Sequence, residues 1–429
     1  MRVSNLKFIN LGHARIVRRV LILGALVFFC ALTMSTTVRV SHAAGPSVVA
    51  FSSSTYSEPE GMTFKTITVL RTGDVSGPAT VDYATANITA SQRSDYTAAL
   101  GTLRFAAGES SKTFDALISQ DIKLEGTETF TITLSNGTGQ ALLGTPSTAT
   151  VSIIDDPIET GPNPIDFNDI FVGQHYHDFL ARQSDNPGQV FWEGQISSCG
   201  SSQICIDDRR TNVSAAFFLS IEFQQTGYFV IRAHKAAFGN AKSNPRYLTF
   251  LRDGRRVSDG VIVGNTGWEA LLDANRQAFL EEFVSRSEFV AVFPQGVNVF
   301  TYVDTLFANE GVTTPTTSER TAAINAYGTG NTLGRAAALK SVIESDSVFK
   351  TQYNQAFVLM QYFGYLRRDA DDAPDNNFSG YDFWLNKMNQ VSVPGENVRD
   401  DSVALARVKR ADMVKSFIVS SEYRGRFGL

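Results

Sequence analysis

The residues with the clearest chemistry are three carboxylates that precede an alternating segment in the first third of the chain. Asp121, Glu125 and Glu128 lie close together, and apolar residues alternate with threonines through residues 129–134. This alternation predicts a half-buried β-strand. Carboxylates crowded into the loop that feeds a strand repel one another, and a hard cation relieves that repulsion. The pattern therefore predicts a cation site at one end of a β-domain.

The elements that must position these carboxylates are short β-strands. Between residue 46 and about residue 157, short alternating runs are separated by turn formers such as Gly73, Gly108 and Asn136-Gly137. The runs that we predict to be strands are residues 48–51, 66–71, 80–83, 102–105, 113–118, 128–134 and 148–154. Seven short strands in about 110 residues favour an immunoglobulin-like sandwich.

An ordered series of motifs in this region resembles the Calx-beta domain. The motifs are Glu58-Pro59-Glu60-Gly61, Val81-Asp82-Tyr83-Ala84-Thr85, Ser94-Asp95-Tyr96, Gly101-Thr102-Leu103-Arg104-Phe105, Glu125-Gly126-Thr127-Glu128-Thr129-Phe130 and Ile153-Ile154-Asp155-Asp156. The resemblance covers about a quarter of the chain. It implies the β-sandwich that serves as the calcium sensor of sodium–calcium exchangers and that is widespread in bacterial surface proteins.

The resemblance also implies Ca²⁺ ligands at one end of the sandwich. Carried over motif by motif, these ligands are Glu60, Asp95, Asp121, Glu125, Glu128, Asp155 and Asp156. Ca²⁺ takes about six to eight oxygen ligands and favours carboxylates and carbonyls. Gln120 stands where the family has the first Asp of an acidic run, and Pro157 replaces a third Asp after Asp156. Both differences remove negative charge, so we expect fewer or weaker ions than in the exchanger sensors.

The N-terminal segment predicts export. A basic region ends at Arg18-Arg19, residues 20–32 are apolar, and Ser41-His42-Ala43 provides a small-residue cleavage site. Residues 1–43 are therefore predicted to be a signal peptide. The alternative, an uncleaved anchor, is disfavoured because the apolar run is shorter than the ~20 residues that span a bilayer.

Removal of residues 1–43 makes the chain more acidic. These residues hold six basic side chains and no acidic one, so 32 basic and 43 acidic residues remain, with a net charge of −11. This charge disfavours nucleic acid or an anionic membrane surface as a partner. We expect a bacterial protein that is secreted or held at the cell surface.

Two cysteines remain in the exported chain, Cys199 and Cys205. In an exported protein this close pair predicts a disulfide. A zinc site is a poor alternative because no His or further Cys lies at ligand spacing. A redox pair of the Cys-x-x-Cys type is absent from the sequence.

Beyond a linker at residues 158–164, the apolar periodicity changes from two to about 3.6 and predicts helices throughout residues 165–429. The pattern that starts at Phe171-Val172 returns at Phe357-Val358, and each copy leads to a Phe-Trp pair. A Phe followed five residues later by Glu and an aromatic residue recurs at Phe217, Phe283 and Phe417. We predict three or four helical repeat units. They resemble an uncharacterised helical domain of bacterial extracellular and surface-layer-associated proteins, a family without an established activity.

Three features of the helical region have competing interpretations. Residues 369–375 look like a calcium loop, but Pro374 stands where an EF-hand has Gly, so we predict a polar turn with capping carboxylates. His175 and His177 lack the spacing of a helical metal pair, so packing or surface roles are favoured. Core packing is favoured over a glycan-binding platform for Trp192, Trp268 and Trp384.

Together these patterns predict a secreted or cell-surface, calcium-binding structural protein of the adhesion type. The alternative is a metal-free β spacer that carries a helical protein- or glycan-binding region. Partners other than Ca²⁺ are expected among cell-surface proteins or glycans. The sequence contains no Gly-x-Ser-x-Gly elbow, P-loop or Rossmann fingerprint, so we assign no catalytic residue and expect no enzyme.

Overall fold

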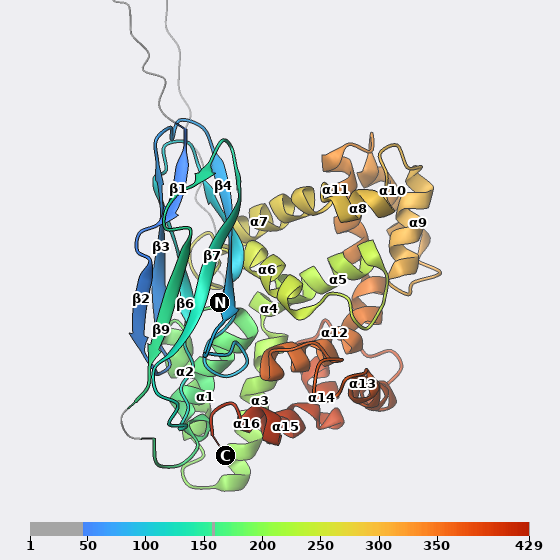
Figure 1. Cartoon of the computed structure of the whole chain (residues 1–429). Coiled ribbons are helices and arrows are strands. Elements are labelled where there is room, and N and C mark those ends of the chain that lie inside the picture. Colours follow the sequence, from blue (N-terminus) through green and yellow to red (C-terminus); the bar gives the residue numbers. More distant parts are fainter. Residues whose placement is uncertain (1–45, 157–158, 429) are drawn as a thin grey trace, which may run out of the picture. The chain divides into compact units, whose positions relative to one another are not determined.

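A computed structural model describes residues 46–156 and 159–428 (Figure 1). The range Ala44–Leu429 forms one compact unit, in which a β-sandwich is followed by a helical region. The predicted signal peptide at residues 1–43 lies outside the described residues. Within the described ranges, no helix combines the length and apolarity required to cross a membrane.

Two sheets form the sandwich. One has the strand order β6-β3-β1-β8 and the other the order β2-β9-β7-β4-β5. The strands are β1 (Val48–Phe51), β2 (Thr55–Pro59), β3 (Phe64–Thr72), β4 (Ala79–Asn87), β5 (Leu100–Phe105), β6 (Ser111–Leu117), β7 (Glu128–Thr138), β8 (Leu142–Leu143) and β9 (Thr148–Ile154). In β7 the alternation is confirmed, because Phe130, Ile132 and Leu134 are buried between the sheets. The predicted sandwich followed by helices is therefore confirmed.

The sandwich differs from the prediction at β2, at β8 and at one turn. Strand β2 lacks an alternating apolar face, and its parallel pairing with β9 sets its position instead. The turn predicted at Asn136-Gly137 is wrong, because β7 continues to Thr138. Asn136 has a φ of 52°, and the pairing of β7 with β4 shifts register between Thr80 and Asp82. A bulge of this kind absorbs a turn-forming pair within a strand.

The helical region begins with a 3₁₀ turn, η1 (Pro164–Asp166), and its core lies around the long helix α12. Most side chains of α5 and α12 are buried, so other helices cover these two on several sides (Figure 1). The remaining elements are α1 (Asn168–His175), η2 (Tyr176–Leu180), α2 (Asn186–Ser197), α3 (Gln203–Leu219), α4 (Ile221–Gln225), α5 (Gly227–Phe238), α6 (Tyr247–Ser258), α7 (Trp268–Phe283), α8 (Ser287–Val292), α9 (Val299–Asn309), α10 (Thr317–Tyr327), α11 (Thr332–Ile343), α12 (Asp346–Leu366), α13 (Ser379–Val391), α14 (Asp401–Ala411), α15 (Met413–Ile418) and α16 (Ser421–Arg424).

Histidine and tryptophan side chains of the helical region contribute to packing. His175 and His177 are buried, and the Nε2 atom of His175 lies 2.7 Å from the Ser214 hydroxyl oxygen. A surface role for either histidine is therefore wrong, and packing is confirmed. The indoles of three tryptophans pack against the helical core and remain partly accessible. They belong to Trp192, Trp268 and Trp384.

Buried polar contacts join the sandwich to the helical region. Arg367, at the C-terminal end of α12, is 1% exposed and donates to the Tyr96 carbonyl at 2.8 Å and the Thr97 hydroxyl at 2.8 Å. Its Nε donates to Asp178 at 2.9 Å, and Arg426 donates to the same carboxylate at 3.0 Å. Removing one partner from a buried ion pair is strongly destabilising, so Asp178 holds Arg367 in place. The hydrogen bonds from Arg367 to Tyr96 and Thr97 then join the helical region to the sandwich.

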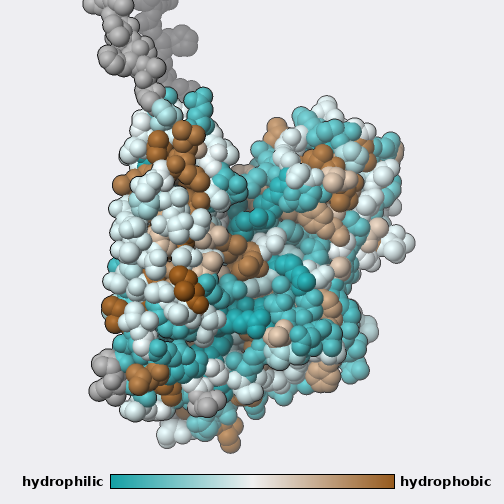
Figure 2. Space-filling model, viewed as in Figure 1, coloured by the Kyte–Doolittle hydropathy of each residue, from teal (hydrophilic) through white to brown (hydrophobic). Residues whose placement is uncertain are grey.

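Hydrophilic residues predominate where the two regions meet on the face shown in Figure 2. Hydrophobic residues appear there in small groups between them. On this face, the surface along the junction is therefore mainly polar.

Candidate metal site

Loops at one end of the sandwich bring the predicted carboxylates together. Asp95 lies between β4 and β5, and the acidic loop of residues 118–127 lies between β6 and β7. A bridge between Tyr96 and Ile118 joins these two loops, and the Tyr96 ring stacks on the buried Phe130 ring at 4.0 Å. Asp155 follows β9, which pairs with β7, so it reaches the same end.

The first carboxylate cluster contains Asp95, Asp121 and Glu125, each of which offers one oxygen within 4.8 Å of the others. Asp95 accepts the backbone N–H of Ser91 at 2.6 Å through Oδ2, whereas its buried Oδ1 has no partner among the described residues. Asp121 is 3% exposed and accepts the Lys123 N–H at 2.7 Å. Backbone donors thus fix the orientation of two carboxylates and leave oxygens free for a further ligand.

The second cluster contains Glu60, Asp155 and Glu159, each of which also offers one oxygen within 4.8 Å of the others. Glu60 accepts the backbone N–H of Asp121 at 2.7 Å, so a hydrogen bond connects the two clusters. Asp155 accepts the Gly126 N–H at 2.6 Å through Oδ2. Asp155 Oδ1 and Glu159 Oε1 are buried without a partner in the described ranges.

Burial and mutual repulsion raise the pKa values of these carboxyl groups. Burial, followed by the Asp121 charge, raises the pKa of Glu60 to about 9. Burial, followed by the neighbouring Asp95, raises the pKa of Glu128 to about 8. The pKa values of Asp121, Glu125 and Glu159 are also raised, with burial as the largest cause. A bound cation favours the charged forms, because it replaces repulsion with attraction.

Of the seven predicted ligands, the structure places some in the two carboxylate clusters and leaves others outside them. Five of them lie in the clusters: Glu60, Asp95, Asp121, Glu125 and Asp155. Glu128, the first residue of β7, is half-buried and lies in neither cluster. Asp156 also lies in neither, and its Oδ2 accepts the amide of Gln120 at 3.4 Å. The amide at position 120 therefore stabilises a carboxylate that a cation would otherwise stabilise.

Glu159 is a candidate ligand that no sequence motif indicates. It stands in the segment that the composition predicts to be a linker, where an acidic residue is ordinarily solvated. The only local signal was its position four residues after Asp155. Its proximity to Glu60 depends on the path of the chain after β9, which no periodicity encodes.

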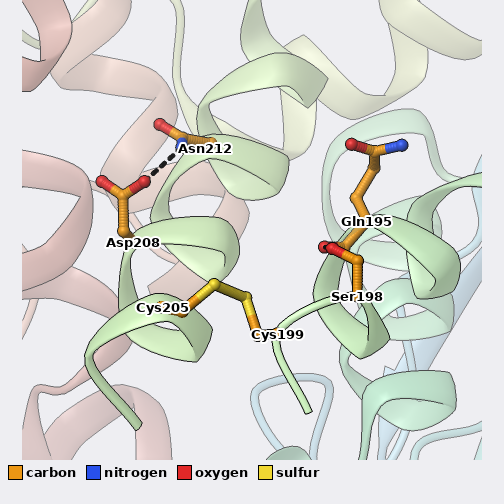
Figure 3. The surroundings of a disulfide bond; sticks show 6 residues. All are labelled: Gln195, Ser198, Cys199, Cys205, Asp208 and Asn212. Carbon is orange, nitrogen blue, oxygen red and sulfur yellow. Dashed lines mark hydrogen bonds between the residues drawn. A yellow bond between two sulfur atoms is a disulfide. The ribbon is translucent and has the colours of Figure 1, made fainter. Parts of the chain in front are cut away.

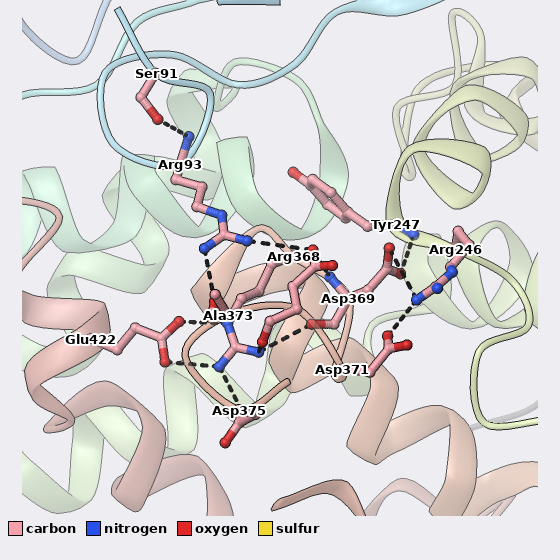
Figure 4. A network of polar contacts seen from close by, with 11 residues as sticks. Ser91, Arg93, Arg246, Tyr247, Arg368, Asp369, Asp371, Ala373, Asp375 and Glu422 are labelled. Atoms are coloured by element: carbon pink, nitrogen blue, oxygen red, sulfur yellow. Dashed lines mark hydrogen bonds and ion pairs between the residues drawn. The ribbon is translucent and has the colours of Figure 1, made fainter. Parts of the chain in front are cut away.

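The second calcium-like segment, residues 369–375, is a turn held by arginines (Figure 4). Arg368 donates to Asp375 at 2.7 Å and to Glu422 at 2.6 Å. Asp369 accepts the backbone N–H of Tyr247 at 2.8 Å, at the start of α6. The predicted polar turn with a capping carboxylate is confirmed.

Cys199 and Cys205 form a disulfide between the end of α2 and the start of α3, with their Cα atoms 5.5 Å apart (Figure 3). Asp208 accepts the Asn212 amide at 2.9 Å one turn further along α3. The disulfide therefore closes a short surface loop.

The fold and its carboxylate clusters define a β-sandwich domain with a candidate cation site. Residues 42–157 match the Calx-beta domain family, so the chain contains a Calx-beta domain. The Adhesion G-protein coupled receptor V1 of Danio rerio is 39% identical over 113 residues, which cover 26% of this chain and 2% of that protein.

Solved structures similar to the chain include two Calx proteins. The apo-form Calx CBD1 domain is 32% identical and covers 26% of this chain and 98% of its own, with a TM-score of 0.26. The calcium binding domain CBD12 of CALX1.1 is 33% identical and covers 25% of this chain and 45% of its own, with a TM-score of 0.25.

Proposed function

We propose that this chain is an exported structural protein of the adhesion type whose Calx-beta domain binds Ca²⁺ at its acidic end. The observation that carries the proposal is the cluster of Asp95, Asp121 and Glu125, whose oxygens lie within 4.8 Å of one another. The buried, unpartnered Oδ1 of Asp95 supports it further. A set of carboxylate oxygens suits a hard cation such as Ca²⁺.

Each cluster supplies ligands for one ion under this proposal. Asp95, Asp121 and Glu125 hold the first, and the second cluster holds another next to Glu60. The Asp121 N–H donates to Glu60, so the backbone at Asp121 positions ligands of both ions. Gln120 stands where the resembled family has an Asp, so this end of the sandwich carries less negative charge and the second ion binds more weakly.

Calorimetry with Ca²⁺ on the chain from residue 44 onward tests this proposal. We expect heat of binding and a rise in Tm, and we expect Asp121→Asn combined with Glu125→Gln to weaken binding at least ~10-fold, about 1.4 kcal/mol. Glu58→Gln is the matched control, because Glu58 lies outside both clusters and pairs with Lys65 at 3.2 Å. Absence of both heat and a Tm shift at millimolar Ca²⁺ would refute the proposal.

The alternative function is that of a metal-free spacer. Two contacts favour it: the Gln120 amide lies next to Asp156, and the Lys123 ammonium lies 3.7 Å from Asp121. In a spacer, these contacts and protonation of the carboxyl groups with raised pKa values reduce the repulsion without a metal ion. The double variant then melts at the same temperature with and without Ca²⁺, as does the unsubstituted chain.

The helical region, we infer, is built from repeats that mediate contacts with cell-surface proteins or glycans and has no catalytic activity. Matched contacts support the repeats. Arg182 donates to Glu222 at 2.7 Å, as Arg368 does to Glu422 at 2.6 Å. Export through residues 1–43 to the bacterial exterior belongs to the same proposal and rests on their sequence pattern.

A further inference from the structure

A cleft of about 410 Å³ lies between strands β5 and β6 of the sandwich and helices α6 and α7. Seven basic and three acidic side chains line it, although the chain as a whole has a net charge of −5. In Figure 2 the surface where α6 and α7 meet the sandwich combines strongly hydrophilic and hydrophobic residues. The excess of positive charge in a concave site raises the local concentration of anions.

Two of the three acidic residues of the cleft, Asp253 and Glu282, form ion pairs with arginines. Asp253 is fully buried and accepts both terminal nitrogens of Arg286, at 2.7 and 2.9 Å, and His234 Nε2 lies 2.7 Å from it. Glu282 is paired with Arg104 of the sandwich. These pairs connect the walls of the cleft and neutralise part of its charge.

Two arginines retain hydrogen-bonding capacity toward the cleft. Arg252 contacts Asp253 through Nε at 3.2 Å, and its side chain is 45% exposed. Arg256 approaches Glu282 only to 3.7 Å. Burial, followed by the nearby Arg104, lowers the pKa of Arg256. The planar guanidinium groups suit a carboxylate.

The opposite wall of the cleft is aromatic. The rings of Tyr83 and Phe114 stack with centroids 3.9 Å apart at 19°. Gly101 lies directly against Tyr83, where a Cβ would come within 2.9 Å of the hydroxyl oxygen. Phe114 remains partly accessible. A flat apolar wall opposite arginines favours a ligand with rings and carboxylates over a small inorganic anion.

We propose that this cleft binds an acidic glycan, with uronate carboxylates on Arg252 and Arg256 and a sugar ring against Phe114. The site is separate from the carboxylate clusters and requires no Ca²⁺. It therefore goes beyond the calcium-binding function.

Binding of hexagalacturonate to the chain from residue 44 onward, measured by calorimetry in EDTA, tests the proposal. EDTA removes Ca²⁺, so a failure of calcium binding leaves this result unaffected. We expect saturable binding that weakens several-fold as salt rises from about 50 to about 300 mM, because screening reduces the attraction. Neutral maltohexaose should not bind.

The variant Arg252→Gln with Arg256→Gln should bind hexagalacturonate at least ~10-fold more weakly, since two charge-assisted contacts are lost. Arg209→Gln is the matched control, because Arg209 is exposed on α3 and does not line the cleft. It should bind within about two-fold of the unsubstituted chain.

Three outcomes would overturn the proposal: no saturable binding by the unsubstituted chain, equal binding of maltohexaose, or equal weakening by Arg209→Gln. Displacement by an equal concentration of pyrophosphate would also overturn it, because the cleft would then be a general anion site. If the double variant has a lowered Tm, the salt series and the maltohexaose comparison on the unsubstituted chain decide.

Discussion

At the scale of single residues, the acidic end of the sandwich is organised by backbone donors that hold carboxylates close together. Glu60 accepts the Asp121 N–H, Asp95 accepts the Ser91 N–H and Asp155 accepts the Gly126 N–H. Each hydrogen bond stabilises a carboxylate, yet burial still raises the pKa of Glu60 to about 9. The cluster therefore takes up protons at neutral pH when no cation is bound.

This protonation predicts opposite pH dependences for stability and for Ca²⁺ binding. The folded, Ca²⁺-free chain holds a proton on Glu60 that the unfolded chain releases above its ordinary pKa of 4.5. The stabilising contribution is complete below that value and is lost as pH rises through about 9. Ca²⁺ bound next to Glu60 must displace this proton, so Ca²⁺ affinity rises with pH.

Thermal melts at about pH 6, pH 7.5 and pH 9, in EDTA and in Ca²⁺, check this prediction. We expect the Tm in EDTA to fall and the Ca²⁺-induced shift to grow across the series. Glu60→Gln should flatten both trends, because the titrating group is removed. A Ca²⁺-induced shift that shrinks toward pH 9 would contradict the assignment.

At the scale of elements, matching arginine contacts recur in the first and last parts of the helical region. Arg182 lies over the Tyr176 ring at 4.8 Å, and Arg368 lies over the Tyr362 ring at 5.2 Å. Each arginine is also bonded to a glutamate at the start of a short helix. The N-caps of these helices are Ser220 and Ser420.

The Arg368→Met substitution should destabilise the helical region by about 1–3 kcal/mol. Arg368 has a side chain 1% exposed, and its loss leaves Glu422 and Asp375 without their partner. Urea unfolding followed by far-ultraviolet circular dichroism measures the effect. Arg209→Met on the surface of α3 is the control and should change the free energy of unfolding by less than ~0.5 kcal/mol. Equal effects of the two substitutions would show that the buried contacts contribute little.

At the scale of the whole molecule, the acidic loop of the sandwich also contacts the C-terminal residues of the helical region. The Ile122 N–H donates to the Phe427 carbonyl at 3.1 Å, and Lys123 donates to the Arg426 carbonyl at 3.4 Å. Arg367 contacts the loop that carries Asp95 through the carbonyl of Tyr96. A cation that orders these loops therefore stabilises the surface on which the helices rest.

Tryptophan fluorescence reports this coupling, because all three tryptophans lie in the helical region. We expect Ca²⁺ to raise the unfolding temperature detected by tryptophan emission, although the carboxylates belong to the sandwich. Arg367→Met should lower that temperature and abolish most of the Ca²⁺-induced shift, since the buried Arg367–Asp178 pair is lost. Calorimetric Ca²⁺ binding should survive. An unchanged fluorescence shift in the variant would show that the coupling does not depend on Arg367.

Features that depend on local periodicity and residue type follow from the amino-acid sequence alone. The alternation in residues 129–134 predicts which side chains of β7 are buried, and the change of period after the linker predicts the helices. Strand β1, at Val48–Phe51, and strand β9, at Thr148–Ile154, have the predicted bounds. These patterns predict structure because a strand or a helix buries one face, and its apolar residues therefore recur with the period of that element.

Contacts between groups that are distant in the sequence depend on the three-dimensional fold. Asp95 reaches Asp121 through the bridge between Tyr96 and Ile118, and Glu159 reaches Glu60 from beyond β9. Arg367 is buried, although its charge alone predicts exposure, because Asp178 and sandwich carbonyls receive its donors. Such contacts depend on strand pairing and loop paths between residues far apart in sequence, and no local period carries that information.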